Sequence, residues 1–210
     1  MSDKHLIVLD LDGTLLKDEK TISPRTKNVL QSLQNNGHEV MIATGRPYRS
    51  SEPYYREMGF KTPIVNFNGA FTHHPLHAGW GMHHSPLDIK VAKDIVEAMD
   101  DYRFHNIIAE VKDDVYFHYH DEKLIDILHH GSQFLQASPT SMLIHSDEND
   151  VAGIRKHLSD VHAEVIDHRR WADPWHVIEI VRNGMSKAVG VDLVSKDLGI
   201  SRKNIIAFGD

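Results

Sequence analysis

The chain has 210 residues, of which 40% are hydrophobic and 25% are charged, a balance typical of folded globular domains. Its formal net charge of −7 argues against a nucleic-acid-binding surface, which needs clustered lysine and arginine. No apolar run approaches the roughly 20 residues that cross a bilayer, and the first residues leave no room for a signal peptide. The absence of cysteine excludes disulfides and thiolate metal sites, and with these observations we expect a cytoplasmic protein. A chain of this length can form one large domain or two small ones.

The first part of the chain alternates strand-like and helix-like segments. We expect strands at 5–10, 40–43 and 64–67, helices at 24–36 and 49–58, and a turn and flap at 12–22. Ser23 suits the N-cap of the first helix, and Pro24 suits its first position. Strands separated by helices of this length indicate βαβ units and a parallel sheet.

The pattern changes between about residues 81 and 178. Here we expect strands at 105–111, 115–119, 140–145, 161–166 and 176–181, and helices at 85–99, 121–130 and 147–158. This mixture predicts an α+β unit with a mostly antiparallel sheet under helices. A helix at 186–198 and a strand at 204–208 follow. We therefore expect a core of residues 1–80 and 179–210 that is interrupted by an inserted domain of residues 81–178.

Two carboxylates follow the first strand directly. Asp10 and Asp12 stand at its carboxyl end, which is where open α/β sheets bind their ligands. A spacing of two places both side chains on one side of an extended backbone. Gly13 allows a sharp exit of the chain. A solvated acidic turn would show the same local sequence, so the rest of the chain has to decide between the two interpretations.

Four stretches together resemble one known family. Asp10–Leu15 reads D-L-D-G-T-L, Ile42–Arg46 reads I-A-T-G-R, Lys187 follows Gly184-Met185-Ser186, and Ile205–Asp210 reads I-I-A-F-G-D. In this order they resemble the four signatures of the haloacid dehalogenase superfamily, most of whose members are phosphatases and phosphotransferases. T-G-R, N-G-A at 68–70 and the long insert before the lysine resemble its Cof-type branch. The resemblance implies a doubly wound, Rossmann-like α/β core with a parallel sheet and an inserted α+β cap domain.

The resemblance also implies roles for individual residues. Asp10 would be the nucleophile that forms an aspartyl-phosphate, and Asp12 the general acid and base. Two neighbouring carboxyls resist joint ionisation, which would let one of them hold a proton. Thr44, Gly45 and Lys187 would bind the phosphate. Mg²⁺ would be held by Asp10, by the backbone carbonyl of Asp12 and by Asp210, with water molecules completing an octahedron.

Two further side chains have open interpretations. Arg46 and Asn68 lie after the ends of the second and third strands, on the side of Asp10. Both are candidates for binding the substrate. A surface salt bridge explains Arg46 equally well, and a turn before Gly69 explains Asn68 somewhat better.

The predicted function is a Mg²⁺-dependent phosphatase of a small phosphorylated metabolite, such as a sugar phosphate, with the cap closing over the site. A phosphomutase or phosphotransferase would use the same aspartyl-phosphate. A third interpretation is a catalytically impaired fragment that only binds. The sequence identifies neither the substrate nor the oligomeric state, and we expect no nucleic-acid or membrane partner.

In the resembling family, Gly209–Asp210 begins a longer signature, so we expect a truncated form of a longer protein with weakened Mg²⁺ affinity, little activity and an exposed apolar final strand. A natural short variant is the alternative.

The 17 histidines include pairs at 73–74, 83–84 and 129–130 and the alternating His118 and His120. We interpret most of them as structural or surface residues, because no Asp/Glu pattern completes a metal site.

Overall fold

The computed structural model describes residues 4–119, 135–171 and 174–209. The chain divides into two compact units, residues 1–84 with 186–210 and residues 85–185. Sequence analysis places both boundaries several residues earlier. Strand β5 (Met82–His84) pairs with β4 (Phe71–His73) in the first unit, and β10 (Val177–Arg182) pairs with strands of the second unit. The first boundary therefore follows β5, a strand that was not predicted, and the second follows β10, a strand that the predicted boundary at residue 178 divides.

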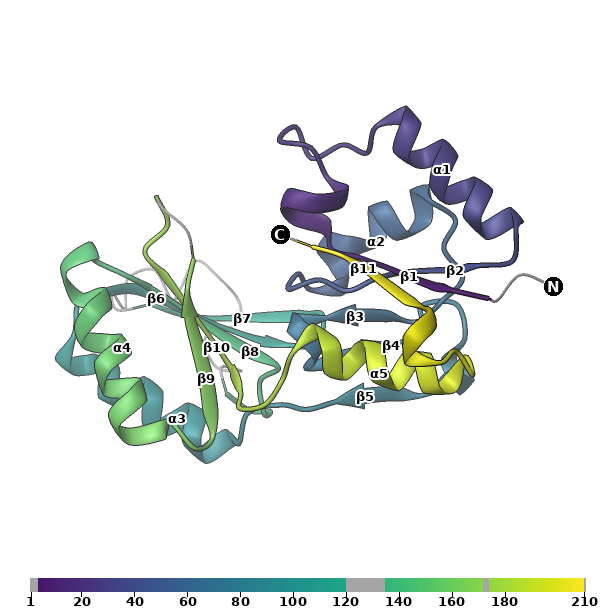
Figure 1. Ribbon diagram of the computed structural model, residues 1–210. Coiled ribbons are helices and arrows are strands. Elements are labelled where there is room, and N and C mark those ends of the chain that lie inside the picture. The colour runs from purple at the N-terminus through teal and green to yellow at the C-terminus, as the bar shows by residue number, and fades with distance from the viewer. Residues whose placement is uncertain (1–3, 120–134, 172–173, 210) are drawn as a thin grey trace. The chain divides into compact units, whose positions relative to one another are not determined.

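The first unit is built on a parallel sheet with the strand order β11–β1–β2 (Figure 1). Its strands are β1 (Leu6–Leu9), β2 (Glu39–Ile42) and β11 (Ile205–Phe208). The register places Leu6 beside Glu39 on one side and beside Ile205 on the other. All four residues of β1 are buried, as expected for a central strand with covered faces.

Helices lie against both faces of this sheet. They are α1 (Pro24–Asn35), α2 (Tyr48–Glu57) and α5 (Lys187–Asp197). Ile7 packs in one apolar cluster with Leu30 of α1 and Tyr55 of α2. Its neighbour Val8 points to the other face and packs with Val194 of α5. This alternation confirms the predicted doubly wound α/β core.

A short antiparallel extension adjoins the parallel strands. β3 (Ile64–Asn66) meets the end of β2 through a parallel bridge between Ala43 and Val65. The turn η2 (Phe67–Gly69) then leads into β4, and β5 pairs with β4. Sequence analysis did not predict β4 and β5, because strands of three residues are too short to show a periodic pattern.

Helix starts follow local capping chemistry. The Ser23 hydroxyl accepts a hydrogen bond from the Thr26 amide at 3.1 Å, and Pro24 is the first residue of α1, as predicted. The helix expected to begin at residue 85 begins later. Helix α3 (Ile89–Ala98) begins after Asp88, whose carboxylate accepts from the Lys90 amide at 2.7 Å. Aspartate is as good an N-cap as serine, so the sequence offered two starts close together.

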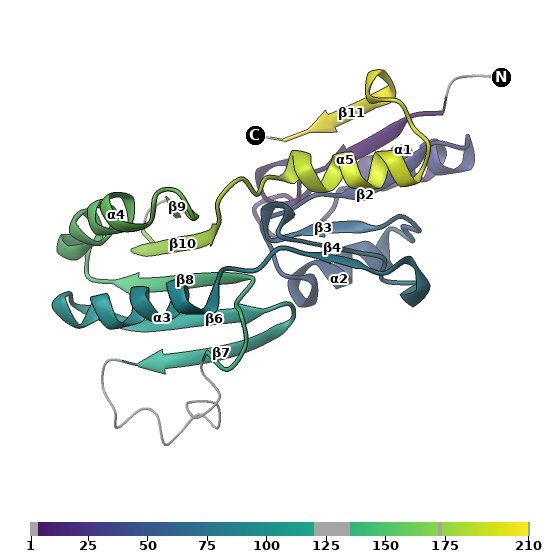
Figure 2. The same cartoon turned by 90° about the horizontal axis from the view of Figure 1, so that it is seen from below.

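The second unit is an antiparallel sheet with the order β7–β6–β8–β10–β9, against which α3 and α4 lie (Figure 2). Its further elements are β6 (Phe104–Val111), β7 (Asp114–Tyr119), β8 (Ser141–Ser146), α4 (Glu148–His162) and β9 (Ile166–Arg170). Alternate residues in the middle of β6 and β8, such as Ile107 and Ile144, pack with Ile95 of α3 and Ile154 of α4. The predicted α+β insert is confirmed.

One boundary in this unit differs from the prediction. Sequence analysis ends the helix at residue 158 and begins a strand at 161, whereas α4 runs to His162 and β9 begins at Ile166. Leu158 and His162 are both buried, and a spacing of four keeps them on one helix face. The expected helix at 121–130 lies outside the described residues. In the part of the chain that the structure describes, no helix is both long enough and apolar enough to cross a bilayer.

Candidate active site

The first signature begins at the carboxyl end of β1. The Asp10 amide donates to the Phe208 carbonyl at 3.1 Å, which continues the ladder to β11. The Asp10 carboxylate is buried at 9% exposure and accepts from the Leu11 amide at 2.7 Å. Gly13 then takes a positive φ of 71°, a conformation available to glycine without strain. The chain turns sharply here and leaves Asp10 at the strand end.

Lys187 meets this carboxylate from the far end of the sequence. Its ammonium group forms an ion pair with Oδ2 of Asp10, although the two residues are 177 positions apart. Lys187 is the first residue of α5, where the helix dipole is positive and a cation is disfavoured unless an anion lies nearby. The pair with Asp10 supplies that anion. The first and third signatures therefore converge in the fold.

The second signature follows β2. Thr44 is 1% exposed, and its hydroxyl oxygen accepts from the Arg46 amide at 3.1 Å. The Thr44 carbonyl accepts from the Asn68 amide at 3.1 Å. A Cβ at Gly45 would approach the Asn68 side-chain nitrogen to 2.9 Å, so only glycine fits here without displacing that side chain. The ends of β2 and β3 are thereby joined.

Asn68 belongs to a buried turn. It has a φ of 51° and is 6% exposed, which agrees with the turn interpretation. The adjacent Gly69 has a φ of 99°, and a Cβ there would lie 2.1 Å from the Ser186 carbonyl oxygen. The backbone of η2 thus packs directly against the residue before Lys187. This contact fixes the start of α5, and with it the base of the Lys187 side chain.

Arg46 does not stand free to meet a substrate in this structure. Its Nε donates to Oδ2 of Asp12, and its Nη2 donates to Oδ1, both at 2.6 Å. The Lys20 ammonium donates to the same Oδ1 at 2.7 Å. The salt-bridge interpretation of Arg46 is therefore the one that the geometry favours, with Asp12 as the partner.

These contacts bear on which carboxyl holds a proton. The hydrogen bonds from Arg46 are the main cause that lowers the pKa of Asp12 to about 2, against the opposing effect of burial, and Lys20 lowers it further. Asp10 is paired with Lys187. Each carboxylate thus has its own cation. The contacts from Arg46 and Lys20 keep Asp12 ionised in the resting site.

Sequence analysis missed two residues of this arrangement, Lys20 and Tyr54. The Tyr54 hydroxyl donates to the Lys20 carbonyl at 3.1 Å, and the Arg46 guanidinium lies 5.7 Å from the centre of the Tyr54 ring. Both residues lie outside the four signatures. A lysine in a polar turn and a tyrosine in a helix carry no sequence signal that distinguishes them from surface residues.

The ligand set can be compared with the needs of Mg²⁺, which prefers oxygen ligands and keeps several water molecules. The Asp10 carboxylate and the Asp12 backbone supply oxygens at the strand end, so the chemistry of the donors is suitable. The predicted third ligand, Asp210, lies outside the described residues. Within residues 4–119, 135–171 and 174–209, no group of three or more His, Cys, Asp or Glu side chains is arranged to hold a metal ion.

The histidines of the first unit mostly contact other rings. His74 lies 4.4 Å from His77 between ring centres, and Phe71 stacks on His73 at 4.6 Å. These contacts agree with structural and surface roles for this part of the chain. His120 and the pair at 129–130 lie outside the described residues.

Comparison with known proteins identifies the family. The haloacid dehalogenase-like hydrolase family matches residues 7–210. The chain is 56% identical over 215 residues to the 5-amino-6-(5-phospho-D-ribitylamino)uracil phosphatase YitU of Bacillus subtilis (strain 168), covering 98% of this chain and 80% of that protein. It is 26% identical over 226 residues to the pyridoxal phosphate phosphatase YbhA of Escherichia coli (strain K12), covering 98% and 81% of the two chains.

Solved structures show the same fold. The structure of TM0651 from Thermotoga maritima aligns with a TM-score of 0.79 and 21% identity, over 97% of this chain and 79% of that one. A haloacid dehalogenase-like hydrolase from Bacteroides thetaiotaomicron aligns with a TM-score of 0.80 and 22% identity, over 98% and 81%. The family predicted from the four signatures is confirmed, and the relatives are named phosphatases. The chain belongs to the haloacid dehalogenase-like hydrolases, in the Cof-type phosphatase branch that its signatures predict.

Proposed function

We propose that this chain is a Mg²⁺-dependent phosphatase that hydrolyses a small phosphorylated metabolite through an aspartyl-phosphate on Asp10. The observation that carries the proposal is the ion pair between Asp10 and Lys187. It joins a carboxylate at a strand end to a lysine at a helix start, and Thr44 follows the neighbouring strand. A nucleophilic carboxylate needs such cationic and donor groups beside it, because the phosphate dianion otherwise repels it.

The side chains can then be given roles in the reaction. Asp10 attacks phosphorus while Lys187 neutralises charge on the phosphoryl oxygens. The Thr44 hydroxyl oxygen accepts from the Arg46 amide, so its own proton remains available for donation to the phosphate. The Gly45 amide is the second donor. Asp12, which is ionised in the resting site, first takes up a proton from solvent when the substrate is bound. It gives this proton to the leaving oxygen and afterwards takes a proton from the water that cleaves the aspartyl-phosphate.

The metal belongs to this proposal as a bound cofactor. The Asp10 carboxylate, the Asp12 carbonyl and Asp210 are the proposed ligands. When bound, Mg²⁺ supplies positive charge that makes the approach of two anions favourable. Removing divalent ions with a chelator should stop phosphate release, and added Mg²⁺ should restore it.

The relatives suggest which substrate to test first. The protein that is 56% identical to this chain is named a phosphatase of 5-amino-6-(5-phospho-D-ribitylamino)uracil, in which the phosphate is attached to a sugar-derived chain. We propose this compound, or a close analogue with a phosphorylated ribityl chain, as the substrate. Ribose 5-phosphate and pyridoxal phosphate are suitable comparison substrates, since a second relative is named for pyridoxal phosphate.

The test measures release of inorganic phosphate by the purified chain and by its Asp10→Asn variant. The amide is isosteric but cannot attack phosphorus, so turnover should fall at least about a thousandfold while the melting temperature changes little. Asp18→Asn is the matched control, because it removes a carboxylate from the exposed turn that follows. Appreciable turnover by Asp10→Asn would remove Asp10 from the nucleophile role. Exchange of phosphate between two sugar positions without release would identify a phosphomutase instead.

A further inference from the structure

The segment after the first signature contains a strained turn. The Lys17 amide donates to the Thr21 carbonyl at 3.0 Å, and the Lys20 amide donates to the Lys17 carbonyl at 2.9 Å. Lys20 has a φ of 57°, in the left-handed region that costs energy for any residue with a Cβ. Turns of this kind usually place glycine or asparagine at that position. The chain instead has a long cationic side chain there.

Tyr54 of α2 connects this turn to the rest of the unit by a hydrogen bond. Its hydroxyl donates to the Lys20 carbonyl at 3.1 Å. The same ring lies beside the Arg46 guanidinium. Tyr54 therefore contacts both residues that donate to Asp12: the backbone of Lys20 and the guanidinium of Arg46.

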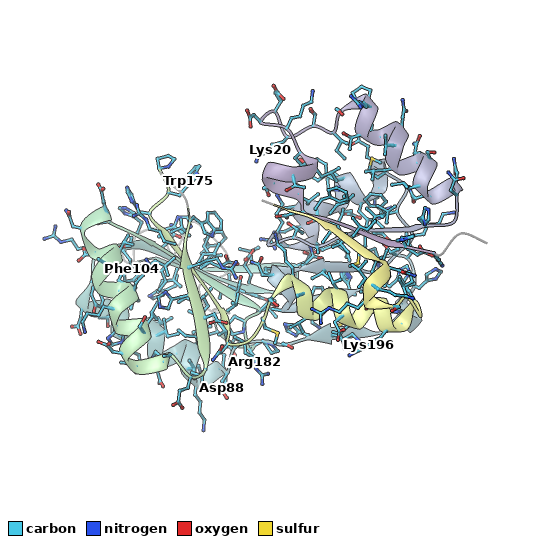
Figure 3. The ribbon with its side chains drawn as sticks, in the orientation of Figure 1. Lys20, Asp88, Phe104, Trp175, Arg182 and Lys196 are labelled. Carbon is cyan, nitrogen blue, oxygen red and sulfur yellow. The ribbon has the colours of Figure 1, made fainter. Side chains whose placement is uncertain are left out.

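Asp12 accepts hydrogen bonds from two residues that lie in different segments of the chain. Oδ1 accepts from Lys20 and Arg46, and Oδ2 accepts from Arg46. Figure 3 labels Lys20 on the loop that follows the first signature. Three hydrogen bonds from separate segments leave the Asp12 side chain little freedom to rotate.

Stability alone does not account for this placement. The side chains of Lys20 and Asp12 are 57% and 46% exposed, and exposed ion pairs contribute little to folding. The left-handed backbone of Lys20 works in the opposite direction. Strain that a weak surface pair does not offset is a reason to look for a functional role.

We propose that Lys20 is a positioning residue that acts through Asp12, and this inference depends on the function proposed above. Together with Arg46, it holds the Asp12 carboxyl in the orientation in which that carboxyl meets the leaving-group oxygen. Orientation of this kind accelerates a reaction without forming part of the chemistry. The turn around Lys20 is thus a supporting element of the active site.

The decisive variant is Lys20→Gly, which relieves the backbone strain and removes the ammonium group. We expect an equal or higher melting temperature, together with an approximately tenfold lower kcat/KM on ribose 5-phosphate, an alkyl phosphate, corresponding to about 1.4 kcal/mol. The kcat/KM of p-nitrophenyl phosphate should be affected little, since its phenolate leaves without a proton and the later hydrolysis of the aspartyl-phosphate does not enter kcat/KM. Lys20→Arg should restore most of the lost rate, because it returns a cationic donor.

Lys17→Gln is the matched control. It removes the same charge from the same turn, and the contacts described for Asp12 come from Lys20 and Arg46 instead. Its rates should equal those of the unmodified chain. Unchanged alkyl phosphate turnover in Lys20→Gly would overturn the proposal, and so would an equal loss on both substrates or a loss that Lys20→Arg fails to recover.

A second measurement separates this proposal from the proposed function. If the unmodified chain releases no phosphate from any substrate, the phosphatase proposal fails, but the coupling of Lys20 to Asp12 can still be measured. Lys20→Gly should raise the melting temperature more in an Asp12→Asn background than in the unmodified chain, because only the latter also loses an ion pair. Equal rises would show that Lys20 does not hold Asp12.

Discussion

Arg46 donates two hydrogen bonds of 2.6 Å to the two carboxylate oxygens of Asp12. The pair connects the first and second signatures and keeps Asp12 ionised in the resting site. A phosphate dianion bound beside Asp10 would add negative charge near this carboxylate. Such charge raises a carboxyl pKa, which is the direction that the proposed proton transfer by Asp12 requires.

Arg46→Lys should show whether this pair matters for the reaction. A single ammonium group cannot make the two parallel hydrogen bonds of a guanidinium. We expect kcat on an alkyl phosphate to fall at least about tenfold, with a smaller change in KM. Arg56→Lys is the control, because Arg56 lies on α2, the helix that follows Arg46, and pairs with Glu52 at its surface. A rise in KM for every substrate, with kcat preserved, would instead place Arg46 in direct contact with the substrate.

Asp12→Asn tests the general acid itself. The amide has no proton of suitable acidity, so turnover of ribose 5-phosphate should fall at least about a hundredfold. The kcat/KM of p-nitrophenyl phosphate should fall much less, because its leaving group needs no proton and the later hydrolysis step does not enter kcat/KM. The ratio of the two kcat/KM values is the measurement. If the ratio matches that of the unmodified chain, Asp12 does not protonate the leaving oxygen.

Gly69→Ala should unfold the first unit much more easily than Gly59→Ala. Both glycines have positive φ, but a Cβ at Gly59 meets nothing within 4 Å, whereas one at Gly69 would lie 2.1 Å from the Ser186 carbonyl oxygen. We expect a loss of about 1 kcal/mol at Gly59 from backbone strain, and at least about 3 kcal/mol at Gly69, where the clash is added. Urea unfolding of both variants measures the difference, and equal losses would contradict the close contact between η2 and the start of α5.

The second unit should lose stability as the pH falls below about 6.5. Burial lowers the pKa of His145, His162 and His168 from 6.5, with further lowering by His105, His157 and Arg155, respectively. The unfolded chain then binds protons that the folded chain does not, so unfolding becomes more favourable as the pH falls through 6.5 towards the lowered values. Melting curves between pH 8 and pH 5 measure the effect.

A histidine variant provides the control for this pH dependence. His162 is 8% exposed, and His162→Gln removes its contribution. The variant should have a shallower dependence of melting temperature on pH than the unmodified chain. Parallel curves would show that His162 does not contribute to the loss.

Some of the site could be predicted because its residues follow strand ends directly. Asp10 and Thr44 stand immediately after apolar runs, and parallel strands bring their carboxyl ends to one edge of a sheet. The left-handed turn at Lys20 could not be predicted in this way, since its sequence is that of an ordinary polar loop. Nor could the hydrogen bond from Tyr54, which connects residues 34 positions apart.

The sequence alone determined the fold class, the family, the insertion of a second unit and the identity of Asp10, Asp12, Thr44 and Lys187 as candidate site residues. These features could be predicted because each of them is a local pattern, formed by residues that lie close together in the sequence. Only the tertiary structure decided how the charges are paired: Asp10 with Lys187, and Asp12 with Arg46 and Lys20. Such pairing depends on distances between segments that are remote in sequence. The pKa of Asp12 responds to those distances, because the groups that lower it, Arg46 and Lys20, belong to other segments of the chain.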